Sequence, residues 1–216
     1  MKKAISAAIL VFVMAGCSKS DAPDADPAGT PLIVRPHIVP RAGDTTFDNG
    51  DVVGLSITTS DDILPFYTIN HKLVFDHTEN CFKADPATPL KWYAADLTAS
   101  FVAYYPYDDD YTPVFEVNAD QSAKAGYTGS DFMFAAMHNV APTLSGVTLQ
   151  FNHVLSQLKL TLDNQEAGRD IISVKVRGSI LAADIDYDNK TATVDTGSIP
   201  CDINTYADPD VQGVYK

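Results

Sequence analysis

Cys17 is the residue whose surroundings point most directly to a chemical modification. Two lysines follow the initiator methionine, residues 4–13 are almost entirely apolar, and Ala15 and Gly16 precede the cysteine. This order is typical of a bacterial secretory signal that ends in a lipobox, where the chain is cut ahead of a cysteine that carries lipid. The sequence therefore predicts a signal peptide over residues 1–16 and a lipidated Cys17 at the mature N-terminus.

A retained transmembrane helix is the alternative for this segment. A helix that spans a bilayer needs roughly 20 apolar residues, and the stretch between Lys3 and Cys17 is shorter than that. A diacyl or triacyl anchor holds a protein on a membrane more firmly than a single chain does. We therefore expect an exported protein that is tethered by lipid.

The other residues with potential for catalysis or metal binding form no recognisable constellation. His153 has no second histidine, cysteine or carboxylate at ligand spacing, so we interpret it as a core histidine. Asp108-Asp109-Asp110 lacks the spacing and glycine of an EF-hand and is interpreted as a solvated loop, with weak calcium binding as the alternative. Carboxylates are plentiful, but no nucleophile elbow, zincin motif or phosphate-binding glycine loop is present. We predict no enzyme activity, no metal and no cofactor.

Two further cysteines, Cys81 and Cys201, lie far apart in the sequence. In an oxidising compartment they pair in a disulfide or remain two lone thiols, and both alternatives fit the sequence. They are too few and too widely spaced for a zinc site.

The mature chain is strongly acidic. Removal of residues 1–16 takes away two lysines and no acid, so the formal net charge changes from −13 to −15. A chain of this charge is repelled by nucleic acid and by anionic lipid surfaces. Nucleic acid is therefore excluded as a partner.

Residues 17–30 predict a flexible tether. They are small, acidic and proline-containing, and such a composition does not bury enough apolar surface to fold. Folded structure is expected to begin near Pro31.

Beyond the tether, apolar residues recur with a period of two, which indicates strands. We expect at most one helical turn, within Ala119 to Gly126, and an antiparallel β-sandwich. The strongest single prediction is Leu158 to Leu162, whose leucines are expected to face the core. The expected strands are Val52 to Thr59, Phe66 to Ile69, Leu73 to Phe75, Ser100 to Tyr105, Val114 to Val117, Val147 to Phe151, Val154 to Leu162 and Ile171 to Val176.

The domain organisation expected from these strands has one main unit. Residues 31–165 form the N-terminal β-sandwich, and residues 166–216 form a second β region that either completes the first unit or begins a second sandwich. About 50 residues are few for an independent domain.

Seven local patterns occur in a fixed order along the chain and, together with the lipobox, resemble one family. The chain is similar to the Mfa-like fimbrillin lipoproteins of Bacteroidetes, the precursors of type V pili, closely over residues 1–165 and loosely beyond. The resemblance implies a transthyretin-like β-sandwich and a fimbrial subunit, and stalk, tip and anchor subunits are all compatible with it. The patterns are Arg41-Ala42, Phe47 to Leu55, Lys91-Trp92-Tyr93, Phe101 to Tyr107, Asp120-Gln121-Ser122, Ser130 to Ala135 and Phe151 to Leu158.

The resemblance also implies a mode of assembly. In the family, a lipidated precursor reaches the outer membrane surface, a trypsin-like Arg-specific protease cuts after an arginine, and the released first strand leaves a groove for the strand of another fimbrial subunit. Host or bacterial surface ligands are the further partners that such fimbriae imply.

The first strand and the cleavage site are assigned by position. Arg41-Ala42 stands just before the Phe47 to Leu55 pattern, whereas Arg35 is followed by Pro36, which blocks trypsin-like cleavage. Arg41 is therefore the expected cleavage residue, and an ordinary first strand with a surface arginine is the alternative. The removable strand comprises Leu32, Ile33, Val34, His37, Ile38 and Val39.

A cluster of aromatic residues supports a second hypothesis from a different class. The cluster comprises Trp92, Phe101, Tyr104, Tyr105 and Tyr107. Exposed rings of this kind stack on sugars, which is the signature of a carbohydrate-binding surface lipoprotein of a glycan uptake system. Alternation within Phe101 to Tyr107 favours packing in the core and at a sheet edge instead.

Overall fold

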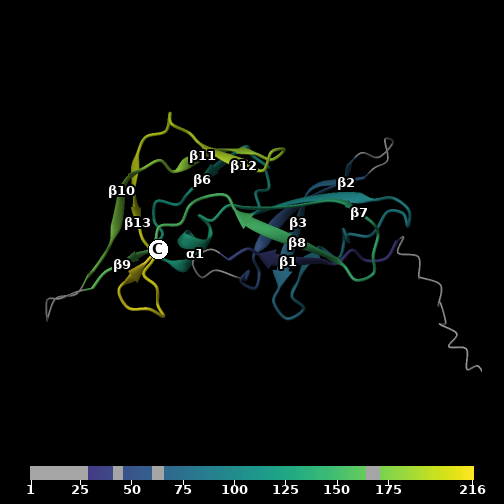
Figure 1. Cartoon of the computed structure of the whole chain (residues 1–216), viewed down its shortest axis with the longest axis horizontal. Helices are drawn as coiled ribbons and strands as arrows, with labels where there is room; N and C mark the ends of the chain where they lie inside the picture. Colours follow the sequence, from purple (N-terminus) through teal and green to yellow (C-terminus); the bar gives the residue numbers. More distant parts are fainter. Residues whose placement is uncertain (1–28, 41–45, 60–65, 164–170) are drawn as a thin grey trace, which may run out of the picture.

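The computed structural model describes residues 29–40, 46–59, 66–163 and 171–216. It consists of a β-barrel and a smaller β region beside it, to the left of the barrel in Figure 1. The elements are β1 (Val34–Ile38), β2 (Val52–Thr59), β3 (Phe66–Asp76), β4 (Cys81–Ala84), β5 (Ala99–Tyr105), β6 (Val114–Glu116), α1 (Lys124–Thr128), β7 (Met133–Val140), β8 (Val147–His153), β9 (Leu160–Thr161), β10 (Lys175–Ser179), β11 (Ala182–Asp186), β12 (Thr191–Val194), β13 (Cys201–Asn204) and β14 (Val214–Tyr215).

The barrel contains seven strands in the order β1-β4-β3-β2-β5-β7-β8. It closes because β1 pairs with both β4 and β8. All neighbours are antiparallel except β1 and β8, which run parallel. The predicted all-β, sandwich-like fold is confirmed, but the two faces of the expected sandwich are joined into one closed sheet with a parallel seam.

Alternation along the strands fills the barrel with apolar side chains. Along β2, Val53, Leu55 and Ile57 are buried, and along β8, Val147, Leu149 and Phe151 alternate with exposed residues. Side chains of a strand point to opposite faces in turn, so each strand places one row inside the barrel. Four aromatic rings also pack around Phe47, three of them edge-on and that of Phe75 tilted.

Glycines make the turn before β2 and its contact with β5 possible. Gly50 adopts a φ of +93° in the Asn49-Gly50-Asp51 turn, which L side chains disfavour. At Gly54 an added Cβ would lie 2.2 Å from the ring of Tyr104. Glycine is therefore favoured at both positions, by the positive φ at the first and by the lack of space for a side chain at the second.

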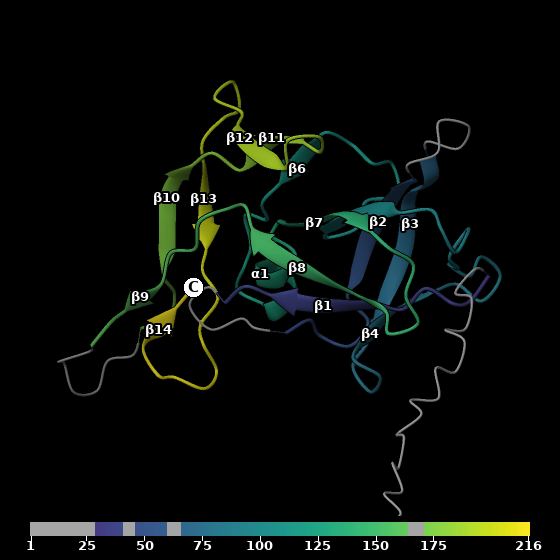
Figure 2. The same ribbon diagram turned by 45° about the vertical axis from the view of Figure 1, so that its right-hand side comes forward.

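Residues 166–216 contribute three small sheets, each formed with or beside earlier parts of the chain. The described residues of this region provide β11 and β12, which join β6 in the order β12-β11-β6, while β10 pairs with β13 and β14 pairs with β9. Figure 2 shows β6, β11 and β12 together above the barrel and β10 and β13 beside it. A second apolar cluster, with Tyr104, Phe132, Phe134 and Ile185 at its centre, packs where this region meets the barrel.

Several expected strands differ from the observed ones. Phe66 to Ile69 and Leu73 to Phe75 belong to one strand, β3, which continues through Asn70 at a positive φ of 50°. The one-turn helix starts later than expected, at Lys124. Strands β4, β7, β11, β12, β13 and β14 were not predicted; all of these except β7 have two to five residues, and so short a strand carries little local signal.

The prediction for Leu158 to Leu162 is wrong. Only Leu160 and Thr161 form a strand, with the two residues of β14, and Leu158 and Leu162 are 52% and 38% exposed. Alternation indicates which residues share a face, but a strand also needs a partner backbone of matching length. Ile171 and Ile172 are likewise exposed, at 37% and 97%, and β10 begins only at Lys175.

Candidate functional site

The predicted removable strand is a continuous part of the barrel. β1 includes Arg35 and Pro36 between the two predicted apolar pieces, and the flanking residues Leu32, Ile33 and Val39 bond to the barrel backbone. Cys17 and the expected cleavage site, Arg41 and Ala42, lie outside the described residues.

Three side chains of the first strand fill the barrel interior. Leu32, Val34 and Ile38 are 7%, 1% and 5% exposed, whereas Arg35 and His37 point outward. Burying an aliphatic side chain of this size contributes about 1.5–3 kcal/mol, so the three together stabilise the barrel by roughly 5–9 kcal/mol. The strand is therefore a substantial part of the core.

The two edges of β1 are bonded unequally. Five residues of β1 pair with β8, and Ile33 and Val39 extend this ladder through bonds of 2.7 and 2.9 Å to Val147 and Phe151. Towards β4, only Val34 pairs, with Phe82. Pro36 accounts for the difference, because alternation turns it towards β4 and it has no N–H to donate. The seam between β1 and β4 is therefore the weaker of the two.

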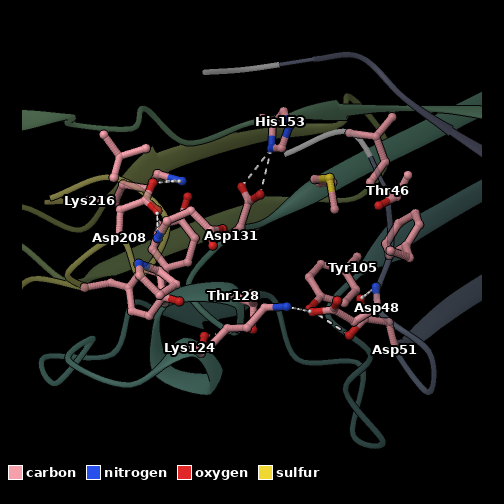
Figure 3. Close-up of a pocket in the computed structure, with 18 residues that line it drawn as sticks. Thr46, Asp48, Asp51, Tyr105, Lys124, Thr128, Asp131, His153, Asp208 and Lys216 are labelled. Atoms are coloured by element: carbon pink, nitrogen blue, oxygen red, sulfur yellow. Dashed lines mark hydrogen bonds and ion pairs between the residues drawn. The ribbon is translucent and has the colours of Figure 1, made fainter. Parts of the chain in front are cut away.

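A cavity of about 530 Å³ opens at the end of β1. Ile38 and Thr46, which stand on either side of residues 41–45 in the sequence, both line it. Figure 3 shows the other walls, which come from α1, from the ends of β5 and β8 and from the C-terminal segment. The cavity thus lies beside the chain positions that flank the expected cleavage site.

The cavity is lined by ionisable groups in pairs. Lys124 lies 2.6 Å from Asp48, Lys216 lies 3.1 Å from Asp208, and His153 Nδ1 lies 2.7 Å from Asp131. As the dashed lines of Figure 3 show, the first pair joins α1 to the residues before β2, the second lies within the C-terminal segment, and the third joins the end of β8 to the residues before β7. The Lys124–Asp48 pair thus holds α1 close to the open end of the barrel.

Burial perturbs two neighbouring groups in the cavity. Desolvation raises the pKa of Asp51, although the carboxylate accepts a 2.7 Å hydrogen bond from the Asp48 amide. Desolvation and the nearby Asp51 charge raise the pKa of Tyr105, whose hydroxyl lies 3.4 Å from Asp51. Both groups are therefore biased towards their protonated forms.

The expectation that His153 is a core histidine with its hydrogen bonds made is confirmed only in part. Its side chain is 6% exposed and Nδ1 contacts Asp131, but Nε2 has no hydrogen-bond partner. Among the described residues, no group of three or more histidines, cysteines or carboxylates is arranged to hold a metal ion.

The other predicted residues serve packing and turns. Trp92, Phe101 and Tyr105 belong to the barrel core, and Tyr104 belongs to the second cluster. These rings are buried, so they form no exposed face for sugars. Tyr107 is partly buried beneath the ammonium of Lys72, which lies 4.9 Å from the ring centre.

The acidic loop Asp108-Asp109-Asp110 has a structural role in the described chain. The Asp108 carboxylate accepts hydrogen bonds from the Thr112 hydroxyl and from the amides of Thr112 and Asp110, which hold its pKa below the usual range. The Asp108 carboxylate thus closes a turn.

Cys81 is buried, Cys201 is exposed, and both are free thiols, so the disulfide alternative is wrong.

Most of the residues that line the cavity were not predicted from the sequence. Tyr127 and Tyr206 stack with ring centres 5.2 Å apart, and Lys216 lies over Tyr127. No spacing rule signals this group, because its members are separated by up to 89 residues and meet only when the C-terminal segment folds back. Within the described part of the chain, no helix has the length and apolar character needed to cross a membrane.

Comparison with known families identifies the chain. Residues 40–214 match the profile of the fimbrillin-like family. The chain belongs to this family. The match begins two residues after the end of β1 and includes the other six strands of the barrel and the second β region as far as Val214. Family membership supports a role as a fimbrial subunit at the cell surface, rather than as an enzyme.

Three crystal structures share the fold of this fimbrillin-like protein. A candidate cell adhesion protein from Bacteroides uniformis is 21% identical with a TM-score of 0.63, over 86% of this chain and 72% of that one. A second candidate cell adhesion protein, from Bacteroides ovatus, is 17% identical with a TM-score of 0.63, over 87% and 77%. A fimbrial protein from Bacteroides ovatus is 18% identical with a TM-score of 0.52, over 87% and 41%. No curated protein matched the chain significantly.

Proposed function

We propose that this protein is a structural or adhesive subunit of a type V pilus that assembles by strand exchange. It is exported as a lipoprotein anchored to the outer membrane through Cys17, and an Arg-specific protease cuts it after Arg41. The first strand then leaves, and a strand of another fimbrial subunit takes its place. The observation that carries this proposal is that β1 closes the barrel by pairing with β4 and β8.

Removal of β1 would leave a defined groove. The outer edges of β4 and β8 would lose their partner, and the interior sites of Leu32, Val34 and Ile38 would open to water. A sheet edge with free N–H and C=O groups is a template for another strand. Exposure of the apolar interior at the same time gives the incoming strand a second source of affinity.

The same geometry favours replacement of β1 by a donor strand over loss of β1 without a replacement. The resident strand pairs with β4 at only one residue because Pro36 interrupts that edge. A donor strand with apolar residues at the same inward positions and no proline would pair along both β4 and β8. Each added backbone hydrogen bond contributes about 0.5–1.5 kcal/mol, so such a donor binds more tightly than β1.

Proteolysis by an arginine-specific protease tests the proposal. The mature chain contains Arg35, Arg41, Arg169 and Arg177; Arg35 precedes a proline and Arg177 lies within β10. We expect cleavage after Arg41 to give Ala42 as a new N-terminus by mass spectrometry. Where a donor strand is present, oligomers that survive mild detergent should follow.

Two substitutions provide the comparison for this assay. Arg41→Ala should abolish both the new N-terminus and the oligomers, whereas Arg169→Ala should leave both unchanged. Oligomers that form equally in the Arg41→Ala protein would refute proteolytic activation. Clean cleavage at Arg41 without oligomers, in the presence of a donor strand, would refute assembly by strand exchange.

A further inference from the structure

The second β region repeats part of the barrel in space. Residues 71–90 and 181–200 follow the same course: a strand, a four-residue turn, a four-residue strand and a second turn. The register of β11 with β12 is that of β3 with β4, shifted by 110 residues in both strands. The corresponding pairs are Leu73↔Ala84 with Ala183↔Val194, Val74↔Lys83 with Asp184↔Thr193, Phe75↔Phe82 with Ile185↔Ala192, and Asp76↔Cys81 with Asp186↔Thr191.

The turns of the two hairpins are built in the same way. Asp76 Oδ1 accepts hydrogen bonds from the amides two and three residues on, at 2.8 and 3.2 Å, and Asp186 Oδ1 does the same at 3.0 and 2.9 Å. Each turn ends in a residue with positive φ, Asn80 at 48° and Lys190 at 58°. Asp85 and Asp195 then close the second turn in both copies.

The repeat extends to a third strand. Phe75 N–H donates to Asp51 C=O at 2.8 Å just before β2, and Ile185 N–H donates to Pro113 C=O at 2.7 Å just before β6. Val52 pairs with Val74, and Val114 pairs with Asp184, the counterpart of Val74. The sheet β12-β11-β6 therefore corresponds to β4-β3-β2 of the barrel (Figure 2).

The two units differ at one edge. In the barrel, the outer edge of β4 pairs with β1 through Val34↔Phe82. In the repeat, Ala192 takes the place of Phe82, and β12 is the last strand of its sheet within the described part of the chain. Because Asp195 N–H points to β11 and donates to Ala182 C=O, alternation directs the backbone groups of Ala192 and Val194 outward.

We propose that the outer edge of β12 is a second strand-accepting edge and that it binds residues 32–35 of a second copy of this chain. The strands run antiparallel, with Val34 opposite Ala192 and Leu32 opposite Val194, which is the register of β1 on β4 carried over by the repeat. This inference rests on the proposed function, because β1 of the second copy must first leave its own barrel.

The side chains on the inner face suit this partner. Ala192 packs against the second apolar cluster, so residues placed opposite Ala192 and Val194 extend an apolar surface. Leu32 and Val34 are the residues of the first strand that already pack in a core. Pro36 lies outside the four residues, 32–35, that would pair with β12, and therefore does not interrupt their hydrogen bonds.

Charges complement each other on the outer face. Arg35 would stand opposite Thr191, whose partner on β11 is Asp186. The hairpin of β11 and β12 carries Asp184, Asp186 and Asp188, followed by Asp195, against a single lysine, whereas residues 31–40 contain Arg35 and no acid. β12 also lacks the lysines and prolines that protect edge strands from unwanted partners.

Photo-crosslinking with a peptide tests this edge in the intact protein. The probe is a synthetic peptide of residues 31–39 that carries a diazirine analogue of leucine at position 32. We expect crosslinks to β12, centred on Val194, that an excess of unlabelled peptide abolishes. Val194→Pro should lower their yield at least about fivefold, because it removes an outward N–H and leaves the bonds to β11 in place.

Two matched controls, one in the protein and one in the peptide, accompany this experiment. Val194→Thr should retain the crosslinks, and a peptide with Arg35→Glu should lose them without any change in the protein. Absence of crosslinks on β12 would overturn the inference. Crosslinks confined to β4 and β8 would also overturn it while supporting exchange in the barrel. Crosslinks on β12 in a protein that never forms oligomers after cleavage would uphold the edge and reject the proposed assembly.

Discussion

Val34→Ala should loosen β1 without unfolding the rest of the barrel. Val34 is 1% exposed and contributes to the core between β4 and β8. Each buried methylene removed costs about 0.8 kcal/mol and the remaining cavity adds to this, so we expect a loss of roughly 2–3 kcal/mol. If β1 can detach as a local unit, this loss appears in the opening of β1 rather than only in global unfolding.

Amide hydrogen exchange measures this opening directly. The Val147 N–H donates to Ile33 C=O at 2.7 Å, so it is exposed whenever β1 leaves β8. At about tenfold per 1.4 kcal/mol, its exchange should accelerate roughly 30-fold to 140-fold. The Phe75 N–H, which donates to Asp51 C=O, reports on the side of β3 that faces β2 rather than on a bond to β1, and its exchange should change much less.

His37→Ala is the matched control, because His37 lies in the same strand with its side chain exposed. It should change the exchange of Val147 by less than about threefold, consistent with the small effect of most surface substitutions. Equal acceleration of Val147 and Phe75 in Val34→Ala would refute the reasoning. It would mean that β1 opens only when the whole barrel unfolds, and a removable strand would lose its physical basis.

Three further outcomes are expected. Cys17→Ser should abolish incorporation of a clickable fatty acid in cells, and equal labelling of the mutant would reject the lipoprotein assignment. Gly54→Ala should lower the melting temperature more than Gly50→Ala, because an added Cβ meets an aromatic ring at 2.2 Å at the first position, whereas at the second it meets nothing within 4 Å and only the positive φ of 93° is strained. Leu149→Asp should prevent folding, whereas Leu158→Asp should cost less than about 1 kcal/mol, since these side chains are 1% and 52% exposed; similar urea midpoints would contradict this.

The sequence was sufficient where structure depends on neighbours along the chain. β2 was predicted with its observed bounds, Val52–Thr59, because apolar alternation follows directly after a glycine turn. β8 was predicted almost as well, and its alternate residues are those that fill the core. The apolar character of the first strand and the burial of the aromatic cluster follow from the same local logic.

The sequence was insufficient where a segment depends on a distant partner. Leu158 to Leu162 alternates as regularly as β8, yet only two of its residues find a partner strand. The repeat of residues 71–90 in residues 181–200 also went unseen, because Asp76/Asp186 and Asp85/Asp195 are the only identical positions. These aspartates close the turns, whereas the other positions carry different residues in the two copies and leave no repeat to detect in the sequence.

The composition and order of residues thus determined an acidic, all-β chain and predicted a first strand that precedes a candidate cleavage site. Only the tertiary structure decided that β1 runs parallel to β8, that Pro36 leaves the β4 side almost unpaired, and that a cavity forms beside the end of this strand. Alternation along one strand fixes which side chains point inward. The identity and direction of the neighbouring strand depend on residues more than 100 positions away, which no local pattern specifies.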